Sequence, residues 1–414
     1  MKELQEKGTK AKQAYKSLVK LSTLEKNQVL EKAAGLILEE EEYILSENKK
    51  DLSAARENNI TGALLDRLTL THERLAGIAE GLQQVAKLDD PVGEVLSMKK
   101  RPNGLTIGQV RVPLGVIGII YEARPNVTAD AFALCLKTGN PVILRGGKEA
   151  INSNKALVKV IQKALAEEKV TAHAIQLVEN TSRESAVGMM KMNDYLDVLI
   201  PRGGAGLIKT VVENSSVPVL ETGVGNCHTF IDDSADQEMA KQIAVNAKTH
   251  RPGVCNAMES LLVHEKIADE ILPDLCNRFN AVKVEIRGDE KVTSLVPFAR
   301  QATEEDWGKE YLDMILSVKV VSSLDEAIEH ISTYGTGHSE TIVTENYTHS
   351  QRFLQEVDAA AVYVNASTRF TDGFEFGFGA EIGISTQKLH ARGPMGLKEL
   401  TTSKYIIYGN GQIR

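Results

Sequence analysis

The sequence predicts an α/β protein with two doubly wound α/β domains and a small β arm for oligomerisation. First, 414 residues are too many for one ordinary hydrophobic core, so two or more domains are expected. Second, short apolar runs alternate with helical segments from Gly115 onward, which is typical of parallel sheets with helices on both faces. Third, the apolar period changes to two between Glu94 and Val112, as expected for a β-hairpin.

The composition indicates a soluble globular protein. Charged residues make up 25% and apolar residues 42% of the chain. The net charge is -8 and basic residues form only short groups such as Lys99-Lys100-Arg101, so nucleic acid is not an expected partner. The amino terminus lacks an apolar signal segment and no apolar run approaches membrane-spanning length, so we expect a cytoplasmic protein without membrane contact.

The cysteines predict reduced thiols and no metal site. Cys135, Cys227, Cys255 and Cys276 are widely separated, and no Cys-x-x-Cys motif occurs. This spacing fits neither a disulfide framework nor a zinc site.

The first ninety residues indicate packing helices. One apolar stripe consists of Ala11, Ala14, Leu18 and Leu21. Ser22-Thr23-Leu24-Glu25 is a capping-box pattern that opens the next helix. A third stripe, which ends before Asp89-Asp90-Pro91, consists of Leu75, Ile78, Leu82 and Val85.

The predicted hairpin has a turn at Pro102-Asn103-Gly104 and a second strand at residues 105–112. Both of its faces are fairly polar, so it has little core of its own and is interpreted as a protruding arm. The carboxy-terminal run at residues 405–408 can pair with this hairpin or with another subunit.

The first alternating region predicts a nucleotide site at one sheet edge. Ligands of parallel sheets bind beyond the carboxyl ends of the strands, so the loops after the apolar runs matter most. Two of these loops, at residues 145–148 and 201–206, are rich in glycine and cations, which suits a phosphate, although a strict Gly-x-Gly-x-x-Gly is missing. The apolar runs are residues 116–121, 142–144, 175–178, 198–200 and 217–220.

A second alternation follows Asn226 and carries a thiol, Cys255, in a tight loop. His250 and Arg251 supply positive potential that favours a thiolate, and Pro252-Gly253 bends the backbone. A thiolate there is a competent nucleophile toward a carbonyl carbon. The alternative is that Cys255 is an ordinary buried small hydrophobe, and the local context leaves both interpretations open.

The ordered set of these loops resembles the aldehyde dehydrogenase superfamily, and within it the branch that reduces an acyl phosphate. The resemblance rests on residues 113–128, 221–228 and 381–386 and on the Cys255 loop, and it extends over essentially the whole chain. It implies an aldehyde dehydrogenase-like fold with three parts. These are an NADPH-binding domain at residues 1–94, 114–226 and 366–382, a catalytic domain at 227–365, and an oligomerisation arm and tail at 95–113 and 383–414.

The resemblance also implies roles for single residues. Cys255 matches the catalytic thiol that forms a thioester, and Asn126 matches the asparagine of the oxyanion hole. Arg145 and Lys148 match the loop around the adenosine ribose, and two cations there favour NADPH over NADH. The remaining cofactor positions are Gly203 and Gly204, in the turn under the pyrophosphate, and Glu310, at the nicotinamide ribose.

Two departures from the superfamily pattern concern the substrate. Glu221 matches the glutamate that activates water in hydrolytic members, but water would waste a thioester made from an acyl phosphate, so we expect a lining or structural role instead. Arg124 replaces an aromatic-rich context, and with Arg251 it is expected to bind the phosphate or carboxylate of the substrate. The neighbours to test for the amino acid end of the substrate are Glu122, Arg124, Asn365, Ser367 and Arg369.

The resemblance implies NADPH-dependent reduction of a small molecule, L-glutamyl 5-phosphate, to L-glutamate 5-semialdehyde and phosphate, on the route to proline. It implies a homo-oligomer, and a transient contact with glutamate 5-kinase is a further hypothesis. One alternative is a hydrolytic NAD(P)-dependent semialdehyde dehydrogenase that uses Glu221 as its base. Others are a non-catalytic nucleotide-binding protein and a thiol hydrolase that pairs Cys255 with His250 or His228.

Overall fold

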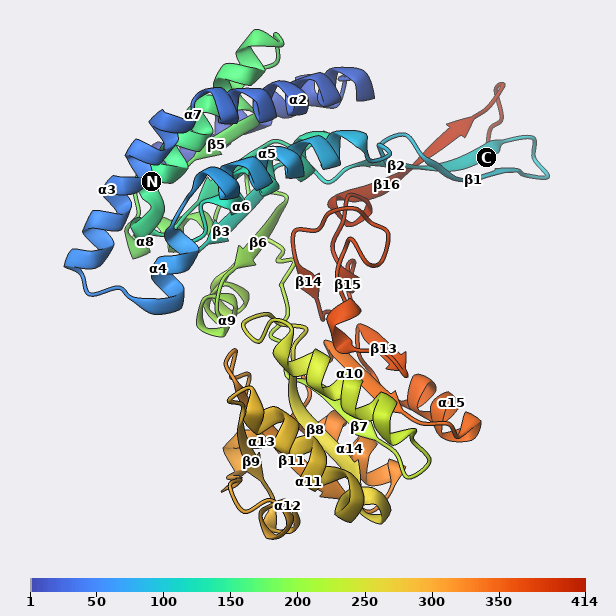
Figure 1. The fold of residues 1–414 in the computed structure, drawn as a ribbon. Helices are drawn as coiled ribbons and strands as arrows, with labels where there is room; N and C mark the ends of the chain where they lie inside the picture. The colour runs from blue at the N-terminus through green and yellow to red at the C-terminus, as the bar shows by residue number, and fades with distance from the viewer. Residues whose placement is uncertain (1) are drawn as a thin grey trace. The chain divides into compact units, whose positions relative to one another are not determined.

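The computed structural model describes residues 2–414, which form two compact units (Figure 1). Unit 1 comprises the chain up to Thr222 together with Gly377–Ile382 and Met395–Arg414. Unit 2 comprises Gly223–Phe376 and Gly383–Pro394. Each unit contains a parallel sheet, so the predicted α/β class is confirmed.

Five helices precede the first strand of unit 1, where the apolar stripes predict helices. They are α1 (Lys2–Leu18), α2 (Thr23–Glu39), α3 (Glu41–Glu57), α4 (Gly62–Leu68) and α5 (His72–Lys87). The predicted capping box opens α2, because Ser22 and Glu25 each accept a hydrogen bond from the other's backbone N–H. The buried stripe of α5 packs against α2. No helix among residues 2–414 is long and apolar enough to cross a membrane.

The sheet of unit 1 has four parallel strands in the order β5-β4-β3-β6. The strands are β3 (Ile117–Tyr121), β4 (Val142–Arg145), β5 (Ile175–Leu177) and β6 (Val198–Arg202). The helices between and after them are α6 (Asn126–Lys137), η1 (Lys148–Ala150), α7 (Ile151–Glu167), η2 (Ala172–Ala174), α8 (Arg183–Met189) and α9 (Ala205–Asn214). Val116 and Ile120 pack with α1 and α8 in one cluster. Helices α6 and α7 contact the strands outside this cluster, so helices cover both faces of the sheet.

One predicted strand of unit 1 is wrong. The apolar run at residues 217–220 is buried, but it joins β6 through a single bridge between Leu199 and Val219 and forms no extended strand. Pro218 lies in the run and has no N–H, so it offers only its carbonyl, which accepts from Leu199.

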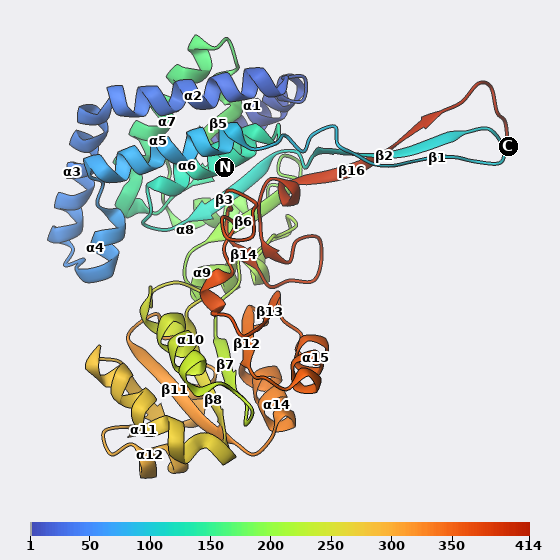
Figure 2. The ribbon, with the colours of Figure 1, turned by 45° about the vertical axis from the view of Figure 1, so that its right-hand side comes forward.

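The predicted arm is a three-stranded antiparallel sheet of unit 1. It consists of β1 (Val95–Lys100), β2 (Thr106–Pro113) and β16 (Thr401–Tyr408), which follows η4 (Lys398–Leu400). β2 is the central strand, and β16 pairs with it from Thr401 opposite Pro113 to Tyr408 opposite Thr106. Figure 2 shows these strands extending away from the rest of unit 1 as a narrow ribbon. The carboxy-terminal run therefore pairs with the hairpin of its own chain.

Unit 2 contains a seven-stranded parallel sheet in the order β10-β9-β11-β8-β7-β12-β13. Its strands are β7 (Cys227–Ile231), β8 (Met258–His264), β9 (Glu285–Gly288), β10 (Arg300–Gln301), β11 (Ile315–Val321), β12 (Ser339–Val343) and β13 (Ala361–Val364). Its helices are α10 (Gln237–Thr249), α11 (Glu265–Ala281), α12 (Glu290–Leu295), α13 (Glu304–Trp307), α14 (Leu324–Tyr334), α15 (Tyr347–Glu356) and η3 (Thr368–Phe370). A short pair, β14 (Ile384–Ser385) and β15 (Gly393–Pro394), completes the unit.

Adjacent residues of the central strands of unit 2 face opposite layers of helices. Ile231 and Leu261 pack with α10 and α11, whereas Phe230 and Leu262 pack with α14 and α15. Two apolar neighbours in sequence can both be buried in this way, which explains the near-continuous apolar runs of these strands.

The compact units are divided differently from the predicted domains, because residues 95–113 and 395–414, predicted as a separate arm and tail, belong to unit 1, and three further segments also differ. Residues 366–376, predicted to lie with the cofactor domain, belong to unit 2, because η3 is bonded to the Cys255 loop. Residues 383–394, predicted as part of the tail, also belong to unit 2, where Lys388 and Arg392 pair with Asp358. Residues 223–226 also belong to unit 2, because the backbone N–H of Gly223 donates to the carbonyl of Ile384 in β14.

Candidate active site

The loop between α10 and β8 presents the most accessible thiol of the protein. Cys255 is half-buried, whereas the other three cysteines of the chain are buried in the structure of residues 2–414. Burial raises the pKa of those thiols, to about 12 for Cys276 and well above the usual value for Cys227. Cys255 is thus more accessible than the other cysteines, which favours the interpretation as a reactive thiol over that of a buried hydrophobe, and its role stays a prediction.

Two buried hydrogen bonds of Asn256 hold the Cys255 loop in place. The side-chain amide of Asn256 donates to the carbonyl of Thr371 at 2.8 Å. The carbonyl of Asn256 accepts from the hydroxyl of Thr368, also at 2.8 Å. These two bonds fasten the residue after the thiol to η3 and the turn that follows it.

The segment before β7 packs directly against the backbone of Cys255. A Cβ atom added to Gly225 would overlap the carbonyl oxygen of Cys255, so only glycine fits there. The thiol of Cys227 donates to the same carbonyl oxygen at 3.1 Å. Asn226, between them, is fixed by hydrogen bonds from its amide to the carbonyls of Trp307 and Tyr334, both at 2.8 Å.

Arg369 of unit 2 interacts electrostatically with both Arg251 and Cys255. Burial lowers the pKa of Arg369, the nearby charge of Arg251 lowers it further, and Cys255 acts in the opposite direction. These groups are therefore close enough to influence one another electrostatically. Positive charge beside a thiol favours the thiolate, and the same charges suit a phosphate or carboxylate ligand. The sequence named Arg251 as a substrate residue and Arg369 only as a neighbour to test.

Glu310, which the sequence assigned to the nicotinamide ribose, lies beside the thiol loop. Its carboxylate accepts a hydrogen bond from the backbone N–H of Gly225 at 2.8 Å. Burial raises the pKa of Glu310, and this hydrogen bond partly offsets the shift. Gly225 therefore contacts both the Glu310 carboxylate and the backbone of Cys255.

The candidate residues of unit 1 lie at one edge of its sheet. Asn126 begins α6 after β3, Arg145 ends β4, and Gly203 and Gly204 connect β6 to α9. Because β3, β4 and β6 are parallel, their carboxyl ends meet at the same edge, as predicted.

The amide of Asn126 has a fixed orientation. It is exposed and donates to the carboxylate of Asp130, one turn further along α6, at 2.9 Å. Burial raises the pKa of Asp130 to about 6, although Asn126 and Arg202 favour its charged form. No second hydrogen bond from this amide reaches any residue of 2–414, so its other N–H can serve a ligand.

The two cations of the predicted ribose loop differ in their surroundings. Arg145 is half-buried and donates to the carbonyls of Thr181 and Ser182 at 2.6 and 3.1 Å. Burial lowers its pKa, and its Nε is buried without a hydrogen-bond partner among the described residues. Lys148 is exposed on η1. Arg145 therefore anchors the loop before α8, and Lys148 is the cation that a dissolved ligand can reach.

The turn under the predicted pyrophosphate already binds an anionic group. The backbone N–H of Gly204, at the start of α9, donates to the carboxylate of Glu122 at 3.0 Å. A Cβ atom added to Gly203 would lie 2.7 Å from the same carboxylate oxygen. This helix end thus has the donor and the close backbone approach that a phosphate requires, but Glu122 must move aside for one to bind there.

Arg124 is the remaining substrate candidate of unit 1. Its side chain is exposed, and its backbone N–H donates to the carbonyl of Glu122 at 2.6 Å. The position is compatible with ligand binding, and the role stays a prediction.

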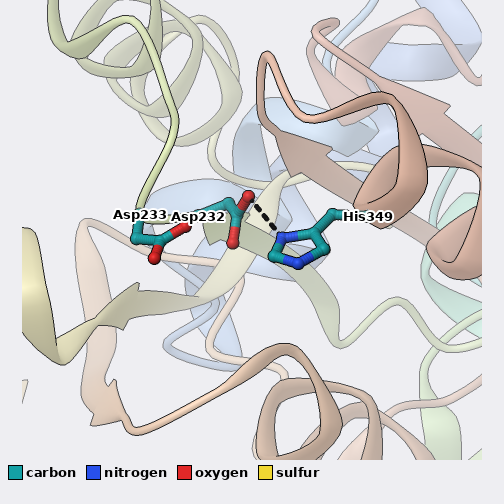
Figure 3. Close-up of side chains that lie close together, drawn as sticks. All are labelled: Asp232, Asp233 and His349. Atoms are coloured by element: carbon teal, nitrogen blue, oxygen red, sulfur yellow. Dashed lines mark hydrogen bonds and ion pairs between the residues drawn. The ribbon is translucent and has the colours of Figure 1, made fainter.

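Three side chains that the sequence did not single out lie together in unit 2 (Figure 3). Ligand atoms of Asp232, Asp233 and His349 are all within 4.8 Å of one another, close enough for a metal ion. Nδ1 of His349 lies 2.8 Å from the carboxylate of Asp232, which also accepts from Thr344 at 2.6 Å. Asp233 pairs with Lys266 at 2.7 Å. Oδ2 of Asp232 and the carboxylate of Asp233 have partners from the chain, whereas Oδ1 of Asp232 is buried without a hydrogen-bond partner among the described residues.

This network is remote from the thiol within unit 2. Asp232 follows the carboxyl end of β7, whereas Cys227, at the amino end of that strand, contacts Cys255. A strand of five residues separates the two ends by roughly 15 Å.

Comparison with known proteins places the chain in a family. The model of the aldehyde dehydrogenase family matches residues 2–311 and 307–406. The chain belongs to the aldehyde dehydrogenase family. Within this family it is 66% identical to a gamma-glutamyl phosphate reductase of Clostridium perfringens, over 99% of this chain and 98% of the relative. It is 63% identical to a protein of that name from Clostridium botulinum, over the full length of both.

A solved structure supports the same fold for this aldehyde dehydrogenase family member. The crystal structure of gamma-glutamyl phosphate reductase from Thermotoga maritima matches with a TM-score of 0.98 and 52% identity, over 100% of both chains. The predicted aldehyde dehydrogenase-like fold is confirmed.

The sequence analysis gave no role to three residues that hold candidate site residues in place. Asp130 was not named, and neither Gly225 nor Cys227 was given a role. For Asp130 the signal was available, because residues four apart on a helix face each other. For Gly225 and Cys227 no local signal exists, since their contact with Cys255 joins segments about thirty residues apart.

We predict that Gly225→Ala displaces the thiol loop, because the new Cβ overlaps the Cys255 carbonyl oxygen. The rate of Cys255 alkylation by iodoacetamide, followed by mass spectrometry, should change by about tenfold. Gly253→Ala is the matched control in the same loop, where a Cβ would lie 3.7 Å from its nearest neighbour. Equal alkylation rates in both variants and the wild type would contradict the prediction.

We predict a pH-dependent effect of Asp130→Asn on stability. The pKa of Asp130 rises from 3.8 to about 6 on folding, so the folded protein keeps a proton that the unfolded chain loses. This group therefore contributes stability at low pH that is lost as pH rises from about 4 to about 6. The free energies of urea unfolding of wild type and variant should diverge across that window. A difference that is constant with pH would count against the assignment.

Proposed function

We propose that the protein reduces L-glutamyl 5-phosphate to L-glutamate 5-semialdehyde and phosphate with NADPH, as a step of proline biosynthesis. The observation that carries the proposal is the half-buried thiol of Cys255, which backbone contacts hold in place and which interacts electrostatically with Arg369. The full-length relatives named gamma-glutamyl phosphate reductase support the same substrate.

In this proposal Cys255 is the nucleophile. Its thiolate sulfur forms a bond to the acyl carbon, the carbon–oxygen bond to the phosphate breaks, and phosphate leaves with that electron pair. The product is a thioester on Cys255. When bound, NADPH supplies the hydride that reduces the acyl carbon. Cleavage of the carbon–sulfur bond then gives the aldehyde and restores the thiolate.

Asn126 is proposed to stabilise the negative charge on the acyl oxygen. Preorganised donors at such a position are worth about 3 kcal/mol each. The hydrogen bond to Asp130 supports this role, because it orients the Asn126 amide before a ligand arrives.

The proposed cofactor residues are distributed over both units. Gly203 and Gly204 would accept the pyrophosphate at the start of α9, and Lys148 would pair with a 2′-phosphate, which favours NADPH over NADH. Arg145 anchors the loop before α8 by donating to the carbonyls of Thr181 and Ser182. Glu310 would hold the nicotinamide ribose.

Guanidinium groups are proposed to bind the anionic substrate. Arg251 and Arg124 are exposed, and Arg369 interacts electrostatically with Cys255. Glu221 is not the base of the reaction in this proposal, because phosphate rather than water is exchanged at the acyl carbon.

The arm supports a homo-oligomer. Its outer strands, β1 and β16, expose Val95, Met98, Tyr405 and Ile407 at 55%, 44%, 68% and 60%. Unpaired strand edges with exposed apolar side chains are suited to contact with a second copy. A transient contact with glutamate 5-kinase stays a prediction of the sequence.

The first test is the reverse reaction, in which glutamate semialdehyde and NADP should give NADPH only when inorganic phosphate is present. Cys255→Ala should abolish this turnover. Glu221→Gln should keep most of it, within about threefold. Phosphate-independent turnover that Glu221→Gln abolishes would instead identify a hydrolytic dehydrogenase.

The second test concerns the cofactor. Lys148→Ala should raise the KM for NADPH about tenfold and leave the KM for NADH unchanged, because only NADPH carries the 2′-phosphate. Lys163→Ala, which removes a surface lysine of unit 1 paired with Glu40, is the control. Equal effects of Lys148→Ala on both cofactors would remove Lys148 from the proposed site.

A further inference from the structure

A buried ion pair closes the loop that carries Cys255. Lys248 is the penultimate residue of α10 and Glu259 is the second residue of β8. The ammonium of Lys248 lies 2.5 Å from the Glu259 carboxylate, and both side chains are 0% exposed. The thiol loop lies between these two residues, so one side-chain contact joins the helix end before the loop to the strand start after it.

The same carboxylate reaches the segment that carries Glu310. The second oxygen of Glu259 accepts from the backbone N–H of Leu312 at 2.9 Å. Leu312 has a φ of 53°, a left-handed conformation that costs a branched residue energy. The bond to Glu259 therefore holds a strained turn two residues after Glu310.

These contacts form a closed circuit within unit 2. From the Cys255 loop it runs through Lys248 and Glu259 to Leu312, and along the chain to Glu310. From Glu310 it returns through the N–H of Gly225, which packs against the Cys255 carbonyl.

Stability alone does not account for the pair. Burial lowers the pKa of Lys248 and raises that of Glu259 to about 7, so desolvation outweighs their attraction. The other groups that act on the pair are Tyr311, Asp313, Glu310 and Cys227. Buried pairs of this kind are often replaced by apolar side chains without loss of stability, which points to a geometric role.

We propose that Lys248 and Glu259 are positioning residues that set the Cys255 loop and the Glu310 segment in a fixed relation. The Cys255 thiol and the Glu310 carboxylate, which is proposed to hold the cofactor, then keep a fixed position relative to each other. This inference rests on the proposed function for the roles of Cys255 and Glu310.

The test uses the double variant Lys248→Met/Glu259→Gln. It removes both buried charges, so none is left unpaired, and the glutamine oxygen still accepts from Leu312. In the phosphate-dependent reverse reaction, kcat should fall about tenfold while the KM values stay within about threefold. Alkylation of Cys255 by N-ethylmaleimide should rise about threefold, because a loosened loop exposes the half-buried thiol more often.

A matched control separates positioning from a general loss of stability. The matched control is Lys26→Met/Asp90→Leu, which removes a buried pair of unit 1 at 2.8 Å with side chains 3% and 7% exposed. It should leave kcat and the alkylation rate unchanged, whatever it does to the urea midpoint.

The proposal would be overturned if Lys248→Met/Glu259→Gln kept the kcat and the alkylation rate of the wild type. Equal changes of kcat and alkylation rate in Lys26→Met/Asp90→Leu would also overturn it. The alkylation rate does not depend on which reaction the enzyme catalyses. If the wild type lacks phosphate-dependent turnover, the proposed function fails, while the alkylation measurement still decides whether the pair positions the loop.

Discussion

The carbonyl group of Cys255 is the point on which the candidate active site depends. Gly225 leaves no space beside it, and the thiol of Cys227 donates to it. Because β7 begins at Cys227 and pairs with β8 from Met258, the register of the central sheet fixes how far the thiol loop extends from the sheet. The position of the Cys255 thiol is therefore set by backbone packing.

The core of unit 2 accepts polar groups near the thiol that an ordinary core would exclude. The imidazole of His228 lies 2.9 Å from the carboxylate of Glu340, and both are fully buried. Burial raises the pKa of Glu340 and lowers that of His330, in edge contact with His228, to about 3. Together with Glu259, these groups place polar residues at the amino ends of β7, β8 and β12. This network is only partly satisfied, because Nε2 of His228, Oε1 of Glu340 and both ring nitrogens of His330 are buried without a hydrogen-bond partner among the described residues.

The two units use opposite edges of their parallel sheets. In unit 1 the candidate residues follow the carboxyl ends of β3, β4 and β6, where helix starts offer backbone N–H groups to phosphates. In unit 2 the thiol precedes β8, at the amino end of the sheet, and the carboxyl ends carry the network of Asp232 and His349 instead. The general rule for parallel sheets thus locates the candidate cofactor residues of unit 1 but not the candidate thiol of unit 2.

The sequence by itself determined the α/β class, the hairpin, the capping box at Ser22 and the thiol loop, because period, turn residues and caps act over a few neighbouring positions. Only the tertiary structure decided that Arg145 is bound by carbonyls while Lys148 is exposed, and that Lys248 reaches Glu259. It also decided which cysteine is accessible. Each of these outcomes depends on which segments, distant in the chain, lie side by side, and burial then sets the energy of every charge among them.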